Sequence, residues 1–145
     1  MNEPTILQPN VTGIAVPQLS TRALPYWEGC RSGELRYLRC GDCGTMPPLP
    51  TPLCPRCAGR QLDWVASVGH GQLYSWTVVW RPQHPAYQVP YAPAIVRLDE
   101  GFTMMSAVVG CAPEALAPGL ALEVEFHAVT DELTLPFFHP VDRQG

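Results

Sequence analysis

The sequence contains no lysine, since all nine of its basic residues are arginine. This absence excludes mechanisms that need a lysine amine, such as Schiff-base chemistry, cofactor anchoring through an aldimine and a Walker-type phosphate loop. Charged residues make up only 15% of the 145 positions. No segment approaches the roughly 20 consecutive apolar residues of a membrane span, and no basic, apolar leader opens the chain. We therefore expect a cytoplasmic protein.

Proline, in contrast, is abundant, with 17 residues. Because proline lacks a backbone N–H and interrupts helices, this content argues against long helices and favours a β-rich domain. Hydrophobic residues account for 46% of the chain, which is enough to form a real core. The length suits one compact domain with a small appendage.

The formal net charge of −4 is distributed unevenly. Residues 1–60 hold six arginines and four acids, whereas residues 61–145 hold nine acids and only Arg81, Arg97 and Arg143. The two parts are thus +2 and −6. A nucleic-acid partner normally requires a basic face, so the acidic C-terminal part argues against that function. The N-terminal arginines could instead meet an acidic partner or a phosphorylated ligand.

Four of the six cysteines form two C-x2-C pairs separated by ten residues, Cys40/Cys43 and Cys54/Cys57. Each pair is typical of a knuckle that points two thiolates at one ion, and two knuckles complete a tetrahedral S4 site. Zinc is the expected ion, one per chain. Because four sulfur ligands leave no open coordination position, this metal would be structural. The alternatives are an iron centre, a dithiol redox pair and disulfides.

The remaining nucleophiles and bases lie outside any recognisable catalytic pattern. Cys30 falls in an expected helix and Cys111 just after an expected strand, where inert, buried thiols are common. The four histidines are scattered along the sequence. His84 is the strongest candidate among them, because loops between barrel strands often carry binding residues. We expect no catalysis by this chain alone, and an independent enzyme that uses His84 or Cys111 is a competing hypothesis.

Periodicity and turn residues predict the order of the elements. Short helical pieces, split by Pro25, are expected at 20–31, and one helical turn is expected at 112–117. The strand at 120–128 alternates most clearly, with Glu123, Glu125 and His127 facing water. In the strand at 73–80, alternation places Leu73 and Trp76 on opposite faces. Strands are expected at 35–38, 62–68, 73–80, 94–98, 102–109, 120–128 and 133–138.

The expected fold is mostly β and has three parts. Residues 1–19 form an extended arm, either a mobile tail or a partner-binding segment. Residues 20–60 combine short helices with a rubredoxin-like zinc ribbon. Residues 61–145 form a C-terminal five-stranded OB-fold barrel that begins with the strand at 62–68.

The order of motifs resembles a known family. Tyr26-Trp27 precedes Gly33-Glu-Leu, Pro47-Pro48 lies between the knuckles, and Gly-x-Leu-Tyr-Ser-Trp-Thr-Val-Val opens the barrel. These pieces are similar to the zinc-ribbon/OB-fold proteins long called a domain of unknown function, which occur beside thiolase-like enzymes. The resemblance covers about residues 20–140. The sequence departs from the pattern at Ala58, where glycine is frequent in the family.

The resemblance implies a non-catalytic accessory subunit in a heteromeric complex. Its partner would be an acyl-CoA-processing enzyme: a thiolase, a thiolase-fold aldolase or a hotdog (MaoC-like) enoyl-CoA hydratase. The alternative is a stand-alone OB-fold that binds a ligand or single-stranded nucleic acid. Because lysine is absent, only arginine and backbone amides could meet the phosphates of CoA. The resemblance implies contacts with CoA or the partner at Arg39, Arg56, Arg81, His84 and Tyr87.

Overall fold

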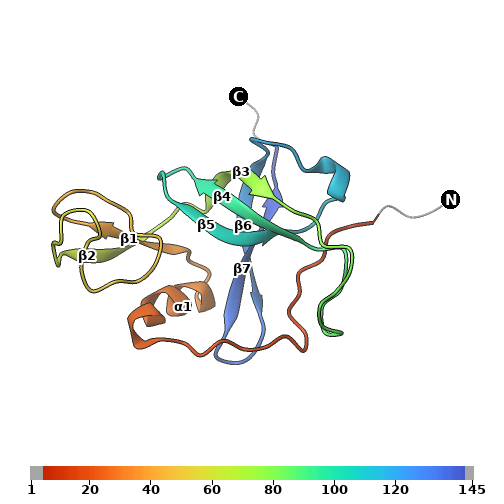
Figure 1. The fold of residues 1–145 in the computed structure, drawn as a ribbon, viewed down its shortest axis with the longest axis horizontal. Coiled ribbons are helices and arrows are strands. Elements are labelled where there is room, and N and C mark those ends of the chain that lie inside the picture. The colour runs from red at the N-terminus through yellow and green to blue at the C-terminus, as the bar shows by residue number, and fades with distance from the viewer. Residues whose placement is uncertain (1–4, 143–145) are drawn as a thin grey trace.

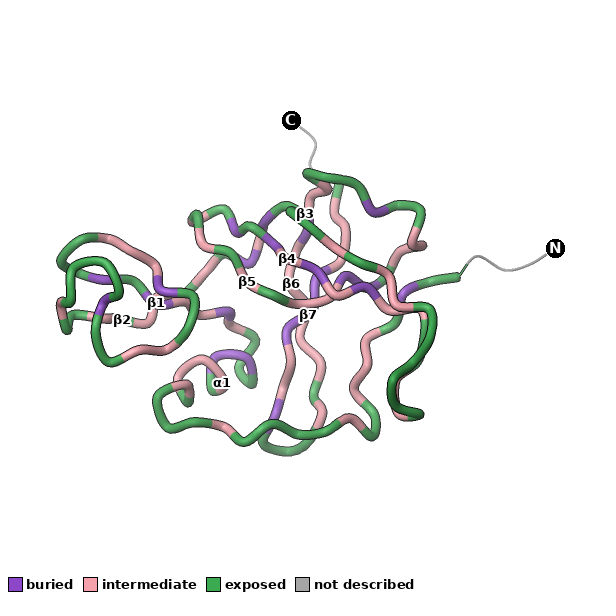
Figure 2. The backbone as a smooth tube through the Cα atoms, viewed as in Figure 1, coloured by how far each residue is buried: buried purple, intermediate pink, exposed green. Residues whose placement is uncertain are grey.

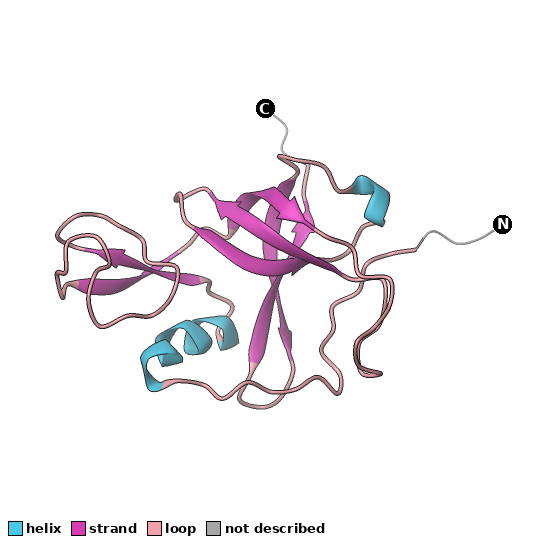
Figure 3. Cartoon of the chain, viewed as in Figure 1, coloured by secondary structure: helices cyan, strands magenta, loops and turns pink. Residues whose placement is uncertain are grey.

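The computed structural model describes residues 5–142 (Figure 1). Positions 1–4 of the expected arm, and Arg143, lie outside the described residues. Strands dominate the described chain (Figure 3), which confirms the mostly β prediction. The elements in chain order are the 3-10 helix η1 (Thr21–Ala23), α1 (Leu24–Arg31), β1 (Arg36–Cys40), β2 (Leu62–Ala66), β3 (His70–Trp76), β4 (Ala92–Leu98), β5 (Thr103–Val108), the 3-10 helix η2 (Pro113–Ala115), β6 (Ala121–Ala128) and β7 (Thr134–Pro140).

Strands β3 to β7 form a closed barrel in the order β3-β4-β5-β7-β6. Neighbouring strands are antiparallel except β5 and β7, which are parallel. The interior is filled by alternate apolar residues, among them Val96, Leu122 and Phe138, each with an exposed fraction of 0% (Figure 2). The fold therefore confirms the prediction of a five-stranded OB-fold barrel.

The first barrel strand, β3, contains a β-bulge. The register between β3 and β4 shifts between Leu73 and Ser75. The extra residue, Tyr74, is pushed outward and is 56% exposed. As a result, both Leu73 and Trp76 pack against the core. The expectation that they lie on opposite faces of one long strand was wrong, since strict alternation does not allow for a bulge.

The strand expected at 62–68 does not belong to the barrel. Residues Leu62–Ala66 pair antiparallel with β1, from Arg36↔Ala66 to Cys40↔Leu62, and form a separate two-stranded sheet. This sheet and the cysteine loops make the ribbon at one end of the molecule (Figure 1). Hydrogen bonds within a sheet depend on distant partners, which explains why the strand was placed in the wrong sheet. The division into independent domains stays a prediction.

The N-terminal arm is attached to the barrel at two described points. Leu7 is fully buried in the barrel core, and its backbone exchanges hydrogen bonds with Cys111 and Gly110, both 2.8 Å long. Asn10 accepts a 2.8 Å hydrogen bond from the N–H of Gln88, in the loop between β3 and β4. A mobile tail therefore does not describe the arm at these positions.

Helix α1 lies beneath the ribbon and the barrel and contacts β1, β6 and β7. Its start follows the sequence signals: Ser20 caps the preceding turn by accepting from the N–H of Ala23, and Pro25 occupies the first turn of the helix, where no N–H is needed. Gly29 allows close packing, because a Cβ there would lie 2.6 Å from the carbonyl oxygen of Glu34. No helix among the described residues is long and apolar enough to cross a membrane.

A single carboxylate fixes the connection between ribbon and barrel. Glu100, in the turn between β4 and β5, accepts 2.8 Å hydrogen bonds from the Ser67 hydroxyl and the Val68 N–H. Ser67 in turn accepts a bond from the N–H of Gly69 through its hydroxyl oxygen. The linker between β2 and β3 is therefore held by the barrel itself.

Candidate metal centre and apolar groove

The four knuckle cysteines converge at the tip of the ribbon. Their Sγ atoms all lie within 4.8 Å of one another. Two of the sulfur pairs, Cys40 with Cys57 and Cys43 with Cys54, are 3.6 Å apart. Ligands about 2.3 Å from a tetrahedral ion are separated by about 3.8 Å, so the four sulfurs fit one ion. The cluster could hold a metal, as the C-x2-C spacing predicted.

The two knuckles have the same backbone design. In the first, Gly44 donates to the carbonyl oxygen of Cys40 at 2.9 Å, and in the second, Ala58 donates to that of Cys54 at 2.9 Å. Both donors adopt a positive φ, 78° for Gly44 and 61° for Ala58. Glycine tolerates this conformation without cost, whereas alanine is strained there. Ala58 nevertheless adopts the same positive φ as Gly44, so the departure from the family pattern leaves the knuckle conformation intact.

Hydrogen bonds lower the pKa of Cys43 and Cys54 and favour their thiolate forms. The pKa of Cys57 is instead raised to about 12, because the other cluster sulfurs outweigh the hydrogen bond from the Gly59 N–H. The N–H groups of Arg56 and Gly59 donate to the sulfurs of Cys54 and Cys57, at 3.4 and 3.3 Å. The side chain of Thr45 lies 3.1 Å from Cys43 Sγ, and this hydrogen bond is the main cause that lowers the pKa of Cys43 to about 6. A thiolate is the form that binds a metal ion.

The other two cysteines have the opposite character. Burial raises the pKa of the Cys30 thiol to about 11, and burial also raises the pKa of Cys111. Both therefore carry little thiolate near neutral pH, which argues against a nucleophilic role.

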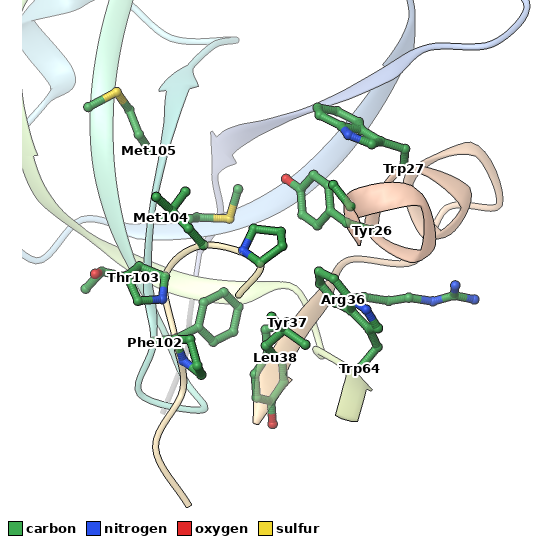
Figure 4. Close-up of a pocket in the computed structure, with 15 residues that line it drawn as sticks. Tyr26, Trp27, Arg36, Tyr37, Leu38, Trp64, Phe102, Thr103, Met104 and Met105 are labelled. Atoms are coloured by element: carbon green, nitrogen blue, oxygen red, sulfur yellow. The ribbon is translucent and has the colours of Figure 1, made fainter. Parts of the chain in front are cut away.

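An apolar groove of about 360 Å³ lies between α1, the ribbon and β5 (Figure 4). Only one of its lining residues is charged, Arg36, and its guanidinium is bonded to Glu34 at 2.7 Å and to the carbonyl oxygen of Pro25 at 2.9 Å. No sequence pattern predicts this groove, because its walls come from segments that are separate in the chain. The principal side chains lining it are Tyr26, Trp27, Tyr37, Trp64, Phe102 and Met104.

A smaller pocket of about 190 Å³ adjoins the groove and shares Leu38 and Trp64 with it. It is lined by two exposed arginines, Arg22 and Arg60. Within residues 5–142, neither guanidinium has an acidic side chain within ion-pair distance. The pocket therefore offers positive charge next to the apolar groove.

The five residues expected to contact CoA or a partner fall into two separate groups. Arg39 and Arg56 are exposed on the ribbon, whereas the other three lie in the loop between β3 and β4 (Figure 1). This loop sits at the opposite end of the molecule from the ribbon. The structure does not bring the two groups together. In the loop, the Nδ1 atom of His84 accepts from the N–H of Ala86 at 3.1 Å, and Tyr87 stacks on Tyr91 with ring centroids 5.6 Å apart.

The polar face of β6 does not simply face water, as the alternation had suggested. Glu125 contacts His127, and Nδ1 of His139 on β7 lies 2.9 Å from the other carboxylate oxygen. All three side chains are about one-third exposed. Glu125 and His127 share one face of β6, whereas His139 joins them only through pairing with β7, which no spacing within one strand could reveal. In the described chain, only the four cysteines gather as a metal site requires.

The fold and the cysteine cluster define a class of protein, a cysteine ribbon joined to an OB-fold barrel. The family described as the C-terminal OB-fold domain of ChsH2 matches residues 64–127. A DUF35 domain-containing scaffold protein of Methanocaldococcus jannaschii is 30% identical over 97 residues, which cover 66% of this chain and 69% of that protein. The chain belongs to the DUF35 family of ribbon and OB-fold proteins.

Two further matches are described as parts of enzymes, one a hydratase and the other an aldolase. A probable enoyl-CoA hydratase alpha subunit of Thermomonospora curvata is 36% identical over 115 residues, which cover 79% of this chain and 36% of that protein. A solved structure, the Ltp2-ChsH2(DUF35) aldolase, contains a chain that is 34% identical and superposes with a TM-score of 0.79. The match covers 86% of this chain and 98% of that one.

The relatives differ in how much of their length the chain represents. It spans about a third of the hydratase alpha subunits that it matches, of which it covers 36% and 35%. It spans nearly all of the DUF35 chain in the aldolase structure.

Proposed function

We propose that this protein is a non-catalytic accessory subunit that docks on an acyl-CoA-processing enzyme. The observation that carries the proposal is its match, at 34% identity, to 98% of a DUF35 chain whose structure was solved as part of an aldolase. The hydratase alpha subunit among its relatives extends the candidate partners to enoyl-CoA hydratases. A thiolase, a thiolase-fold aldolase or a hotdog-fold hydratase is accordingly the proposed partner.

The chemistry of the described residues supports a docking role. The four cysteines would close the coordination sphere of an ion, so the site offers no position for substrate. The thiols outside the cluster have raised pKa values. What the chain offers instead is an apolar groove next to two arginines, which suits contact with another molecule.

The metal in this proposal is one structural zinc ion, held by Cys40, Cys43, Cys54 and Cys57. All-sulfur ligation and sulfur separations near those of a tetrahedron favour zinc, and iron is the alternative. The ion would supply folding energy to a ribbon that has only two short strands. A cytoplasmic location, where thiols stay reduced, belongs to the same proposal.

Contact with CoA is a finer part of the proposal. Arg39 and Arg56 on the ribbon, or Arg81, His84 and Tyr87 on the barrel loop, could each meet its phosphates or the partner. The two groups lie at opposite ends of the molecule, so they are separate candidates for this contact. Substitution of each group in turn, with the affinity for CoA measured in the complex, separates these contacts.

Co-expression tests the proposal. The chain is produced with the thiolase-fold or hotdog-fold subunit encoded beside it, and the mixture is separated by size-exclusion chromatography with light scattering. A stable complex of defined stoichiometry is expected. Separate elution of the two proteins at micromolar concentration would refute the docking role.

A further inference from the structure

One edge of the barrel sheet is open along β5. This strand pairs with β4 over its whole length, from Arg97↔Thr103 to Ala92↔Val108, but with β7 at one position only, Val108↔Phe138. The barrel is thus closed at the C-terminal end of β5. Among residues 5–142, no strand pairs with the N-terminal half of β5 on the side opposite β4.

The direction of the backbone groups on this edge follows from two backbone hydrogen bonds. The carbonyl oxygen of Phe102 accepts from Leu98, so alternate residues from Phe102 onward point toward β4. The N–H of Val109 donates to Phe138, so the intervening residues point away from β4. Thr103 and Met105 therefore direct their N–H and C=O groups toward the open edge.

The apolar groove runs along this same edge. It is lined by the four consecutive residues from Phe102 to Met105. Successive side chains of a strand point to opposite faces of the sheet. Four consecutive residues can therefore line one groove only if the groove follows the edge of the strand. The ribbon loop across the groove contains Pro47, Pro48 and Pro50, which have no N–H to offer β5.

We propose that this edge accepts an extended segment of the catalytic partner as an added strand. The open backbone groups of Thr103 and Met105 would bond the partner's backbone, and the groove would take its alternate apolar side chains. An open, apolar edge is otherwise an aggregation hazard, and Met105 is 76% exposed here. The inference rests on the proposed function, because the segment belongs to the partner enzyme.

Charge specifies the segment further. No acidic residue lines either the groove or the adjoining pocket, and the pocket presents Arg22 and Arg60. The segment therefore carries a carboxylate beside its apolar residues, placed to reach these guanidiniums. A second copy of this chain fits less well, since its own net charge of −4 would be brought against itself.

The test measures binding of the adjacently encoded thiolase-fold or hotdog-fold subunit to variants of the full chain. Met105→Pro removes the N–H that faces the open edge and leaves the ladder with β4 intact, and we expect about tenfold weaker binding. Met105→Ala removes the side chain but keeps the N–H, and it should weaken binding less. Equal losses in the two variants would overturn strand addition.

Hydrogen exchange on the unmodified complex provides a second readout that does not depend on the variants. The Thr103 and Met105 amides should exchange quickly in the free chain and become protected in the complex. A complex that leaves both amides unprotected would overturn strand addition while the accessory function stands, whereas absence of any complex would overturn both. Protection that rises with the concentration of the free chain would identify a second copy at the edge and contradict the proposal.

The arginine pocket has its own control. The double variant Arg22→Gln and Arg60→Gln should weaken binding several-fold and reduce its dependence on salt. Arg31→Gln, at an exposed arginine that lines neither the groove nor the pocket, is the matched control and should leave both the affinity and its salt dependence unchanged. Equal effects of the two sets would contradict an acidic group in the segment.

Discussion

The ring of Tyr37 stacks on the ring of Phe102, with centroids 4.5 Å apart and an angle of 16° between the planes. Tyr37 belongs to β1 of the ribbon and Phe102 to the turn that enters β5 of the barrel. Both also line the apolar groove. This one contact therefore joins the two parts of the molecule and shapes the surface between them.

The stack predicts a measurable coupling between the two rings. In a double-mutant cycle with Tyr37→Ala and Phe102→Ala, the loss of unfolding free energy in the double variant should differ from the sum of the two single losses by about 1 kcal/mol. Urea denaturation of the four proteins measures this coupling. Tyr74→Ala, an exposed aromatic outside the contact, is the control and should be additive with Phe102→Ala. Strict additivity for the first pair would show that the rings do not stabilise the junction.

The connection through Glu100 predicts a second effect at the same junction. Glu100→Ala removes the acceptor for the Ser67 hydroxyl and the Val68 N–H and should cost about 1–2 kcal/mol. Hydrogen exchange of the Val68 amide should accelerate in the same variant. Glu132→Ala, an exposed acid in the turn before β7, is the control and should change stability by less than about 0.5 kcal/mol. An unchanged Val68 exchange rate would contradict this role of Glu100.

The buried arm residue Leu7 predicts that the N-terminus contributes to stability. Leu7→Ala should lower the free energy of unfolding by about 2–5 kcal/mol, because it leaves a cavity in the barrel core. Its neighbour Ile6 is 40% exposed, so Ile6→Ala should cost much less. Chemical denaturation compares the two variants directly. Equal, small losses would mean that the arm is not packed in solution.

The cysteine cluster predicts one zinc ion per chain, measured by elemental analysis of the purified protein. Cys54→Ser should lose most of the metal and give rapid amide exchange in β1 and β2, since a two-stranded ribbon cannot bury enough surface unaided. Cys111→Ser, outside the cluster, should keep the metal. A fully folded ribbon without metal would contradict a structural ion, and a coloured protein containing iron would contradict zinc.

The sequence was informative where chemistry or alternation is local. The C-x2-C spacing placed Cys40, Cys43, Cys54 and Cys57 in one cluster, because a knuckle is a local backbone structure. The clear alternation of apolar residues at 120–128 also located β6, which spans Ala121–Ala128. These features depend on residues that are close in the chain.

Features that depend on partners distant in the chain could not be predicted from the sequence. The bulge at Tyr74 and the membership of β2 in the ribbon depend on which strand lies alongside. The burial of Leu7 depends on a space at the end of a barrel formed by later residues. The groove is likewise a product of packing, since α1, the ribbon and β5 come together only in the folded chain.

Turnover measurements test whether this chain supports a catalytic partner without reacting itself. The acyl-CoA reaction is measured in three samples. These are the adjacently encoded thiolase-fold or hotdog-fold enzyme alone, the enzyme together with this chain, and this chain alone. We expect no turnover by the chain alone, and a large gain in kcat/KM or in the amount of active enzyme when both proteins are present. Full activity of the enzyme without the chain, or turnover by the chain alone, would contradict the accessory function.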